Sequence, residues 1–168
     1  STNGNDFSVN NDLKVAHCAN TVCTEATLTS LDKTTGSSSM TTGADGLGLI
    51  SYIGYPNDDL KVAHCTNTAC TDVTITVLDT TGVNYPSVTI GADGLGLISY
   101  YDFINDNLKV AHCTNTACTE ASITSLDTTG NVGLYTSVTT GADGFGLISY
   151  FNMTNNDLKV AHCTNTAC

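Results

Sequence analysis

Four near-identical copies of one eleven-residue motif divide this chain of 168 residues. Each copy reads Leu-Lys-Val-Ala-His-Cys, then four intervening residues, then a second Cys. The copies lie at Leu13–Cys23, Leu60–Cys70, Leu108–Cys118 and Leu158–Cys168, so that their starts are 47, 48 and 50 residues apart. A period of this size is typical of one supersecondary unit repeated along a chain. The motif therefore predicts a repeat architecture, and it weakens any assignment of a private active site to one copy.

The segment Gly91–Thr140 shows what one repeat contains. Short runs rich in Leu, Ile, Val, Tyr and Thr alternate with Asp-Gly and Asn-Asp turn signals, as expected of antiparallel strands. The strands expected in this repeat are Leu95–Tyr101, Leu108–Cys113, Ala121–Leu126 and Leu134–Thr139. The other copies follow the same plan, including a turn expected at Asp32–Gly36, but residues 1–12 lack the opening strand.

Four short strands in each period of about 45 residues predict an all-β fold of tandem four-stranded antiparallel blades, β-propeller-like. A β-solenoid or an open propeller array is the alternative. The predicted division is an incomplete first repeat at 1–45, a second at 46–93, a third at 94–143 and a partial fourth at 144–168. Because the count is not a whole number, we expect missing sequence or a neighbouring chain to complete the array, and strand addition by successive chains would give a filament.

The pattern Asp-Gly-Leu-Gly-Leu-Ile-Ser-Tyr-Tyr-Asp at Asp93–Asp102, followed by the Cys motif, resembles tandem repeats of bacterial surface and secreted proteins. Those repeats look like relatives of the sialidase-type propeller repeats. The resemblance covers residues 13–168 and implies a β-propeller. It implies no particular chemistry, because the chain has no Trp and no Ser-x-Asp-x-Gly-x-x-Trp signature.

The charge balance excludes several classes of partner. The formal net charge is −11, with five Lys and no Arg, so the chain lacks the cationic groups that bind nucleic acids or anionic membrane surfaces. The apolar runs are too short to span a bilayer, which predicts no membrane insertion. Without Arg, no side chain could hold a sialic acid carboxylate in a bidentate manner, and a sialidase activity is disfavoured.

All eight cysteines fall into four local pairs. The pairs are Cys18 with Cys23, Cys65 with Cys70, Cys113 with Cys118, and Cys163 with Cys168. Even, repeated pairing favours disulfides formed in an oxidising compartment and predicts an extracellular or cell-surface protein. The rival interpretations are a metal site in each repeat and free thiols.

The histidine before each first cysteine has two interpretations. On a strand it shares a face with the apolar Leu and Val of the motif, which predicts a packed, hydrogen-bonded core residue. Alternatively, a column of these side chains could bind a transition metal. The four candidates are His17, His64, His112 and His162. A Cys–His nucleophilic pair would need a thiolate, which a disulfide does not provide.

Recurring aspartates and tyrosines are the remaining candidates. The aspartates of Gly-Ala-Asp-Gly and Asp-Thr-Thr-Gly are expected to accept backbone hydrogen bonds in turns, with calcium binding as the alternative. These aspartates are Asp32, Asp45, Asp79, Asp93, Asp127 and Asp143. Tyrosines at the ends of the first strands are expected to pack at the rim, or, if exposed, to stack on glycans. They are Tyr52, Tyr100, Tyr101 and Tyr150.

These observations predict a non-enzymatic, extracellular structural or adhesive repeat protein that associates with copies of itself, in its strongest form as a filament subunit. No cofactor is required by any motif. Two other functions stay open at this point: a propeller module that binds glycans or another ligand, and a metal-binding repeat array that uses the repeated His and Cys. No residue is assigned a catalytic role.

Overall fold

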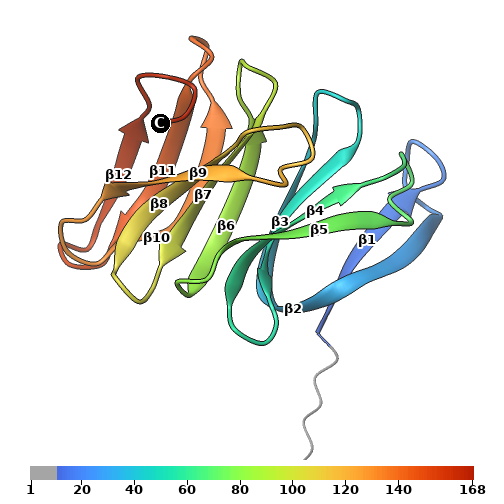
Figure 1. Cartoon of the computed structure of the whole chain (residues 1–168), viewed down its shortest axis with the longest axis horizontal. Coiled ribbons are helices and arrows are strands. Elements are labelled where there is room, and N and C mark those ends of the chain that lie inside the picture. The colour runs from blue at the N-terminus through green and yellow to red at the C-terminus, as the bar shows by residue number, and fades with distance from the viewer. Residues whose placement is uncertain (1–10) are drawn as a thin grey trace, which may run out of the picture.

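Antiparallel strands form the regular structure of residues 11–168, the part of the chain that this computed structural model describes (Figure 1). Within those residues there are twelve strands and no helix, which confirms the predicted all-β class. The strands are β1 (Asp12–Cys18), β2 (Ala26–Thr42), β3 (Gly48–Gly54), β4 (Asp59–Cys65), β5 (Val73–Asp79), β6 (Val83–Ile90), β7 (Gly96–Asp102), β8 (Asn107–Cys113), β9 (Ala121–Asp127), β10 (Val132–Thr140), β11 (Gly146–Asn152) and β12 (Asp157–His162). The expected loss of an opening strand concerns residues 1–12, of which 1–10 lie outside the described part.

Three sheets follow one another along the molecule. Their strand orders are β1-β2-β3-β4-β5, β6-β7-β8-β9 and β10-β11-β12. In Figure 1 they run from the N-terminal end on the right to the C-terminal end on the left. Every pairing is antiparallel and joins strands that are consecutive in the chain, as expected of hairpins linked by short turns.

Strand β2 belongs to two sets of pairings at once. Its first half pairs with β1 as far as Lys33, which faces Asp12, and its second half pairs with β3 from Thr34, which faces Gly54. The turn predicted at Asp32–Gly36 is therefore wrong. This copy has an additional Lys after the Asp, and the extended chain is fixed on both sides: the Thr34 N–H donates to the Asn11 carbonyl and the Thr34 hydroxyl to the Ile53 carbonyl.

We call the four groups of strands units 1 to 4, comprising residues 12–33, 34–79, 83–127 and 132–162. Units 2 and 3 have four strands, unit 1 has two and unit 4 has three. The strand expected to complete each sequence repeat instead opens the next sheet, since β6 pairs with β7 and β10 pairs with β11. The boundaries of the sequence repeats therefore fall in the turns after the first strands of units 2, 3 and 4.

Successive units pack face to face through two different apolar faces. One face carries the Leu and Val of the motif, and the other carries Ile, Tyr, Ala and Cys. Between units 2 and 3, for example, Leu60 and Val62 share a buried cluster with Ile98, Ala111 and Cys113. The clusters between units 1 and 2 and between units 3 and 4 have the same composition, so one kind of joint occurs three times.

The first strands of units 2, 3 and 4 also contact one another directly. The Val88 N–H donates to the Ser39 hydroxyl, and the Val138 N–H donates to the Ser87 hydroxyl, so that β2, β6 and β10 are joined by equivalent bonds. Residues 11–168 contain no helix with the length and hydrophobicity needed to cross a membrane.

Candidate functional site

All four predicted cysteine pairs are disulfides. The bonds are Cys18–Cys23, Cys65–Cys70, Cys113–Cys118 and Cys163–Cys168. Their Cα atoms are 4.7–4.9 Å apart, within the range that a disulfide requires. No cysteine among the described residues is free. The sulfurs are therefore not available as metal ligands or nucleophiles, and the metal and free-thiol interpretations of these residues are wrong.

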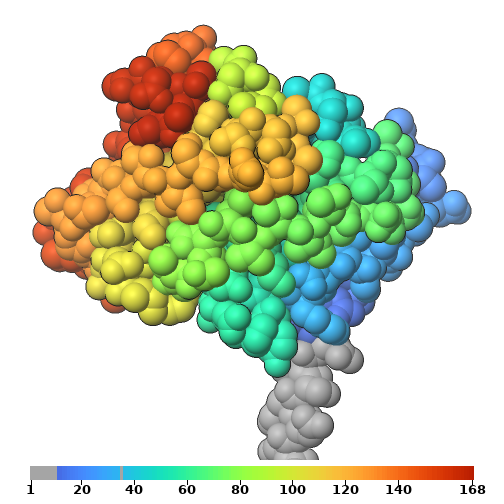
Figure 2. Space-filling model, viewed as in Figure 1, coloured from blue at the N-terminus to red at the C-terminus, as the bar shows by residue number. Residues whose placement is uncertain are grey.

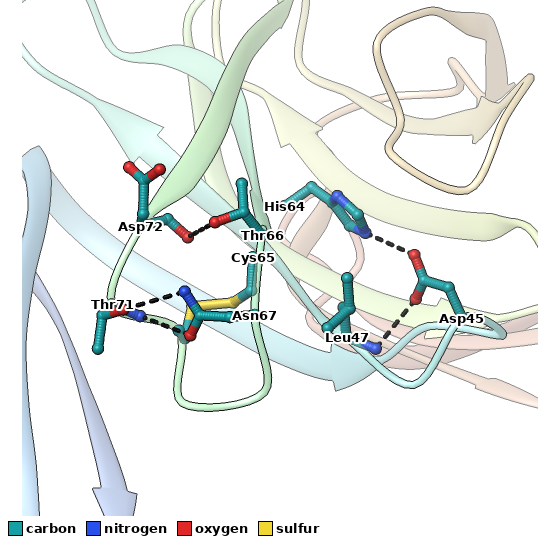
Figure 3. Close-up of a disulfide and its surroundings, with 9 residues drawn as sticks. Asp45, Leu47, His64, Cys65, Thr66, Asn67, Thr71 and Asp72 are labelled. Carbon is teal, nitrogen blue, oxygen red and sulfur yellow. Dashed lines mark hydrogen bonds and ion pairs between the residues drawn. A yellow bond between two sulfur atoms is a disulfide. The ribbon is translucent and has the colours of Figure 1, made fainter.

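Each disulfide closes a loop whose residues also form hydrogen bonds with one another (Figure 3). In the second copy, the Asn67 side chain accepts a bond from the Thr71 N–H and donates to the Thr71 hydroxyl, at 3.3 and 3.0 Å. The Cys70 N–H donates to the Asn67 carbonyl, and Cys70 has a positive φ of 51°. Asn20 and Asn115 make the same bonds to Thr24 and Thr119, so the loop is copied with its internal contacts.

The motif histidine forms an ion pair or hydrogen bond with the aspartate of Gly-Ala-Asp-Gly in the same unit. The Nε2–Oδ2 distance is 2.8 Å for His64 with Asp45 and for His112 with Asp93. His162 and Asp143 are 2.7 Å apart. Figure 3 shows that the second oxygen of Asp45 accepts the Leu47 N–H, two residues on, as predicted for a turn aspartate. We call each such pair a His–Asp clasp.

The backbone and the histidine act together on these carboxylates. The Leu47 N–H, assisted by His64, lowers the pKa of Asp45 below its ordinary value. For Asp93, burial acts to raise the pKa, but the Leu95 N–H and His112 outweigh it and lower the pKa. The turn aspartates are thus held as carboxylates by bonds within their own unit.

The histidines are not gathered into a metal site. His64, His112 and His162 lie in three different units and each contacts the turn aspartate of its own unit, and His17 is exposed. Across residues 11–168 there is no group of three or more His, Cys, Asp or Glu side chains placed to hold an ion. The column of histidines considered from the sequence is therefore not formed.

A second repeated cluster joins one unit to the next. At the end of β5 in unit 2, Asp79 accepts a hydrogen bond of 2.6 Å from the Tyr100 hydroxyl and lies 3.3 Å from the Lys109 Nζ, both in unit 3. Asp32 of unit 1 makes the same contacts with Tyr52 and Lys61 of unit 2, at 2.6 and 3.1 Å. We call these groups Asp–Tyr–Lys clusters.

The third Asp–Tyr–Lys cluster joins units 3 and 4. The Asp127 carboxylate accepts the Tyr150 hydroxyl at 2.8 Å and pairs with Lys159. Each joint between units therefore contains one such cluster, placed beside the apolar contacts described above.

Burial and hydrogen bonding set the protonation states in the cluster of units 2 and 3. Burial acts to raise the pKa of Asp79, but bonds from Tyr100, Thr81 and Lys109 outweigh it, and the pKa is lowered. Burial and the Asp79 carboxylate raise the pKa of Tyr100 well above its ordinary value. The group is therefore a carboxylate, a neutral phenol and an ammonium ion, each bonded to another.

Unit 3 adds a second carboxylate to this cluster. Asp102 is fully buried and its Oδ2 lies 2.7 Å from the Lys109 Nζ. The equivalent position is Gly54 in unit 2 and Asn152 in unit 4. Desolvation acts to lower the pKa of Lys109, but the hydrogen bond that Lys109 donates to Asp102 and the charge of Asp79 raise it.

The tyrosines proposed for glycan stacking are buried. Tyr52 and Tyr100 have no exposed surface, and Tyr150 and Tyr101 are 4% and 6% exposed. The Tyr101 hydroxyl donates to Asp106 at 2.7 Å, and burial together with this carboxylate raises its pKa to about 12. Packing, the first of the two roles considered, is confirmed. Stacking of these rings on a sugar is ruled out because their faces are covered.

One aromatic pair, made of a half-buried and an exposed tyrosine, was missed from the sequence. Tyr85 in β6 and Tyr135 in β10 lie with ring centroids 4.4 Å apart and an interplanar angle of 42°. Both residues have positive φ, near 54° and 52°, next to the irregular pairing of their strands. Ser37 stands at the equivalent place in unit 2, and the recurrence of Tyr before the Ser-Val-Thr of units 3 and 4 is the signal that could have found this pair.

The comparisons with known proteins support the fold alone. No protein-family model and no curated protein matches the chain. Its structure is similar to the crystal structure of a protein of unknown function from Dyadobacter fermentans DSM 18053, with a TM-score of 0.58 and 12% sequence identity. The match covers 76% of this chain and 38% of that protein, so the matched part spans well under half of that protein's length.

Proposed function

We propose that this chain is a non-enzymatic, extracellular structural repeat protein whose units form an open array of propeller-type blades. The observation that carries the proposal is that the Lys, His and Cys side chains of the motif all form bonds within or between the units. In units 2, 3 and 4, the Lys bonds the preceding unit, the His bonds the turn of its own unit, and the Cys closes the hairpin.

These contacts support a scaffold, because a catalytic site repeated in each unit would need side chains that are not already bonded to one another. A general base or nucleophile must be able to reach a substrate proton or carbon. In the Asp–Tyr–Lys clusters the carboxylate, the phenol and the ammonium ion bond one another. The four disulfides are consistent with an oxidising environment, which supports a location outside the cell or on its surface.

The array is proposed to assemble with further copies into filaments. The support is a pair of unlike apolar surfaces on the two outer units, since Leu28 of unit 1 is 71% exposed and Leu158 of unit 4 is 75% exposed. Contacts between unlike ends that do not close into a ring generate open filaments. Negative-stain microscopy of concentrated, oxidised protein is the test. We expect fibres one array wide, whereas monodisperse particles at every concentration would contradict the assembly.

Glycan binding is a second candidate, now supported by a different pair of residues. Tyr135 is 65% exposed and its ring packs at a tilt against that of Tyr85 on the neighbouring first strand, which gives an aromatic surface of the kind that sugars stack on. A glycan array tests this function. Binding should be lost in Tyr135→Ala and kept in Tyr55→Ala, which changes an exposed tyrosine elsewhere; no binding to any glycan would contradict it.

A further inference from the structure

The joint between units 2 and 3 shows which apolar residues of one unit are buried by the unit that follows it. On unit 2, Leu49, Leu60 and Val62 have no exposed surface because unit 3 packs on them. On unit 3, Leu97, Leu108 and Val110 are equally buried beneath unit 4. In both cases the covering unit contributes the Ala and the Cys of its own motif strand. One strand-to-strand contact, Leu-x-Val on Ala-x-Cys, is thus common to both joints.

Unit 4 presents the first half of this joint without a partner in the described structure. Leu147, Leu158 and Val160 are 37%, 75% and 60% exposed, although they occupy the same positions as the buried Leu97, Leu108 and Val110. The register is also unchanged, since Leu147 faces His162 as Leu97 faces His112. We call these three residues the Leu–Val end face. They belong to β11 and β12 at the left end of the molecule in Figure 2.

Unit 1 presents the other half at the opposite end of the molecule. Ala16, Cys18 and Cys23 are exposed, whereas Ala111, Cys113 and Cys118 in unit 3 have no exposed surface. Leu28, which pairs with Ala16 across the two strands, is 71% exposed. We call Ala16, Cys18, Cys23 and Leu28 the Ala–Cys end face.

We infer that the Leu–Val end face of one molecule binds the Ala–Cys end face of a second copy, with β12 packed on β1 of the neighbour. The partner is chosen by the joints inside the molecule, where these same residue types cover each other. A two-stranded unit can make such a joint, because unit 1, with β1 and half of β2, already buries Leu13 and Val15 against unit 2. The contact joins unlike surfaces, so it can repeat without limit.

This inference names the surfaces for the assembly in the proposed function, and it can be tested by blocking each surface separately. Leu158→Asp with Val160→Asp places two charges on the Leu–Val end face, and Leu28→Asp with Ala16→Asp places two on the Ala–Cys end face. All four positions are exposed, so the changes leave the interior joints intact. Ile104→Asp, at a turn residue that is 66% exposed, is the matched control.

Sedimentation velocity at increasing concentration gives the readout. Wild type and Ile104→Asp should form a series of growing species, while each end-face variant alone should sediment as one chain. The decisive sample is an equal mixture of the two end-face variants, in which one intact end of each kind remains. We expect that mixture to form dimers and nothing larger.

Two results would overturn the inference: a mixture that stays monomeric, or end-face variants that grow as wild type does. If the variants still form fibres, the filament proposal stands and the named surfaces are wrong. If wild type forms no fibres but the mixture dimerises, the surfaces are right and the filament proposal fails. Four disulfides by intact mass and an unchanged near-ultraviolet circular dichroism spectrum confirm that each variant is folded.

Discussion

The Tyr100 hydroxyl donates a 2.6 Å hydrogen bond to the Asp79 carboxylate across the boundary between two sheets. Tyr100→Phe removes this donor and leaves a buried carboxylate with one partner fewer. We expect a loss of about 1–3 kcal/mol in the free energy of unfolding, the usual cost of an unsatisfied buried group. Urea denaturation measures it.

Tyr55→Phe is the matched control for this change. Tyr55 is 59% exposed, so the loss of its hydroxyl should alter the free energy of unfolding by less than about 0.5 kcal/mol. Equal effects of the two changes would mean that the Asp–Tyr–Lys cluster does not hold units 2 and 3 together.

Ser51 and Ser99 are equivalent residues in different surroundings. The Ser99 hydroxyl accepts a 2.8 Å bond from Thr136 in the next unit, but the residue in the same place beside Ser51 is Pro86, which has no hydroxyl. Ser51 Oγ is accordingly buried without a partner in the described structure. We expect Ser51→Ala to raise the free energy of unfolding by about 1 kcal/mol and Ser99→Ala to lower it by a similar amount. Denaturation curves showing the same sign for both would contradict this explanation.

Much of the fold could be predicted because the repeated sequence motifs specify local structure. The turn aspartates, the hairpins and the disulfides each depend on residues within about twenty positions of one another, and the periodic spacing exposed them. The Asp–Tyr–Lys clusters could not be predicted in the same way. Asp79, Tyr100 and Lys109 recur with the period, but their meeting depends on how one sheet packs on the next, which no local pattern specifies.

Two differences between the copies show a second reason why parts of the structure could not be predicted from the repeat. Lys33 is an additional residue in the first copy, and it converts an expected turn into continuous strand by pairing with Asp12. Tyr85 and Tyr135 recur in units 3 and 4 and are replaced by Ser37 in unit 2, but their contact depends on how β10 lies beside β6, which the repeat pattern does not specify. A consensus describes the joints well and the exceptions poorly.

The disulfides are expected to contribute unequally. Closing so short a loop stabilises a fold by about 2 kcal/mol in the chain-entropy treatment, so each bridge has a similar entropic term. Cys113 and Cys118 are also fully buried, whereas Cys18 and Cys23 are exposed. Cys113→Ser with Cys118→Ser should therefore lower the free energy of unfolding more than Cys18→Ser with Cys23→Ser. Guanidinium denaturation of the two double variants compares them.

Reduction gives an independent check on the oxidation state. Complete reduction should raise the intact mass by about eight units, two for each disulfide opened. Native protein whose mass does not change, or whose thiols react before reduction, would contradict the disulfide assignment and with it the oxidising compartment.

Acid should weaken the joint between units 2 and 3. Burial acts to raise the pKa values of Asp79 and Asp102, but the hydrogen bonds that they accept lower both below the ordinary value of 3.8. A carboxyl group with a lowered folded pKa contributes stability that is present above its unfolded pKa and is lost as the pH falls through the folded one. The free energy of unfolding should therefore be nearly constant above about pH 5 and fall below about pH 4.

Asp102→Asn is the control for the acid response, since Asn152 occupies the same place in unit 4. The variant removes one titrating group from the cluster, so its stability should change less steeply below about pH 4 than that of wild type. Equal slopes would show that the acid response arises elsewhere in the chain.

The recurrence of one joint has a consequence for how such a chain can change in length. If an interior segment of one period were deleted, unit 2 would meet unit 4, and the Leu49, Leu60 and Val62 surface would lie against a sheet that carries the same complementary residues as the one it lost. Duplication of a segment would insert a joint of the existing kind. Gain or loss of whole periods therefore needs no compensating substitution at the joints, and the length of the molecule can change in steps of one sheet.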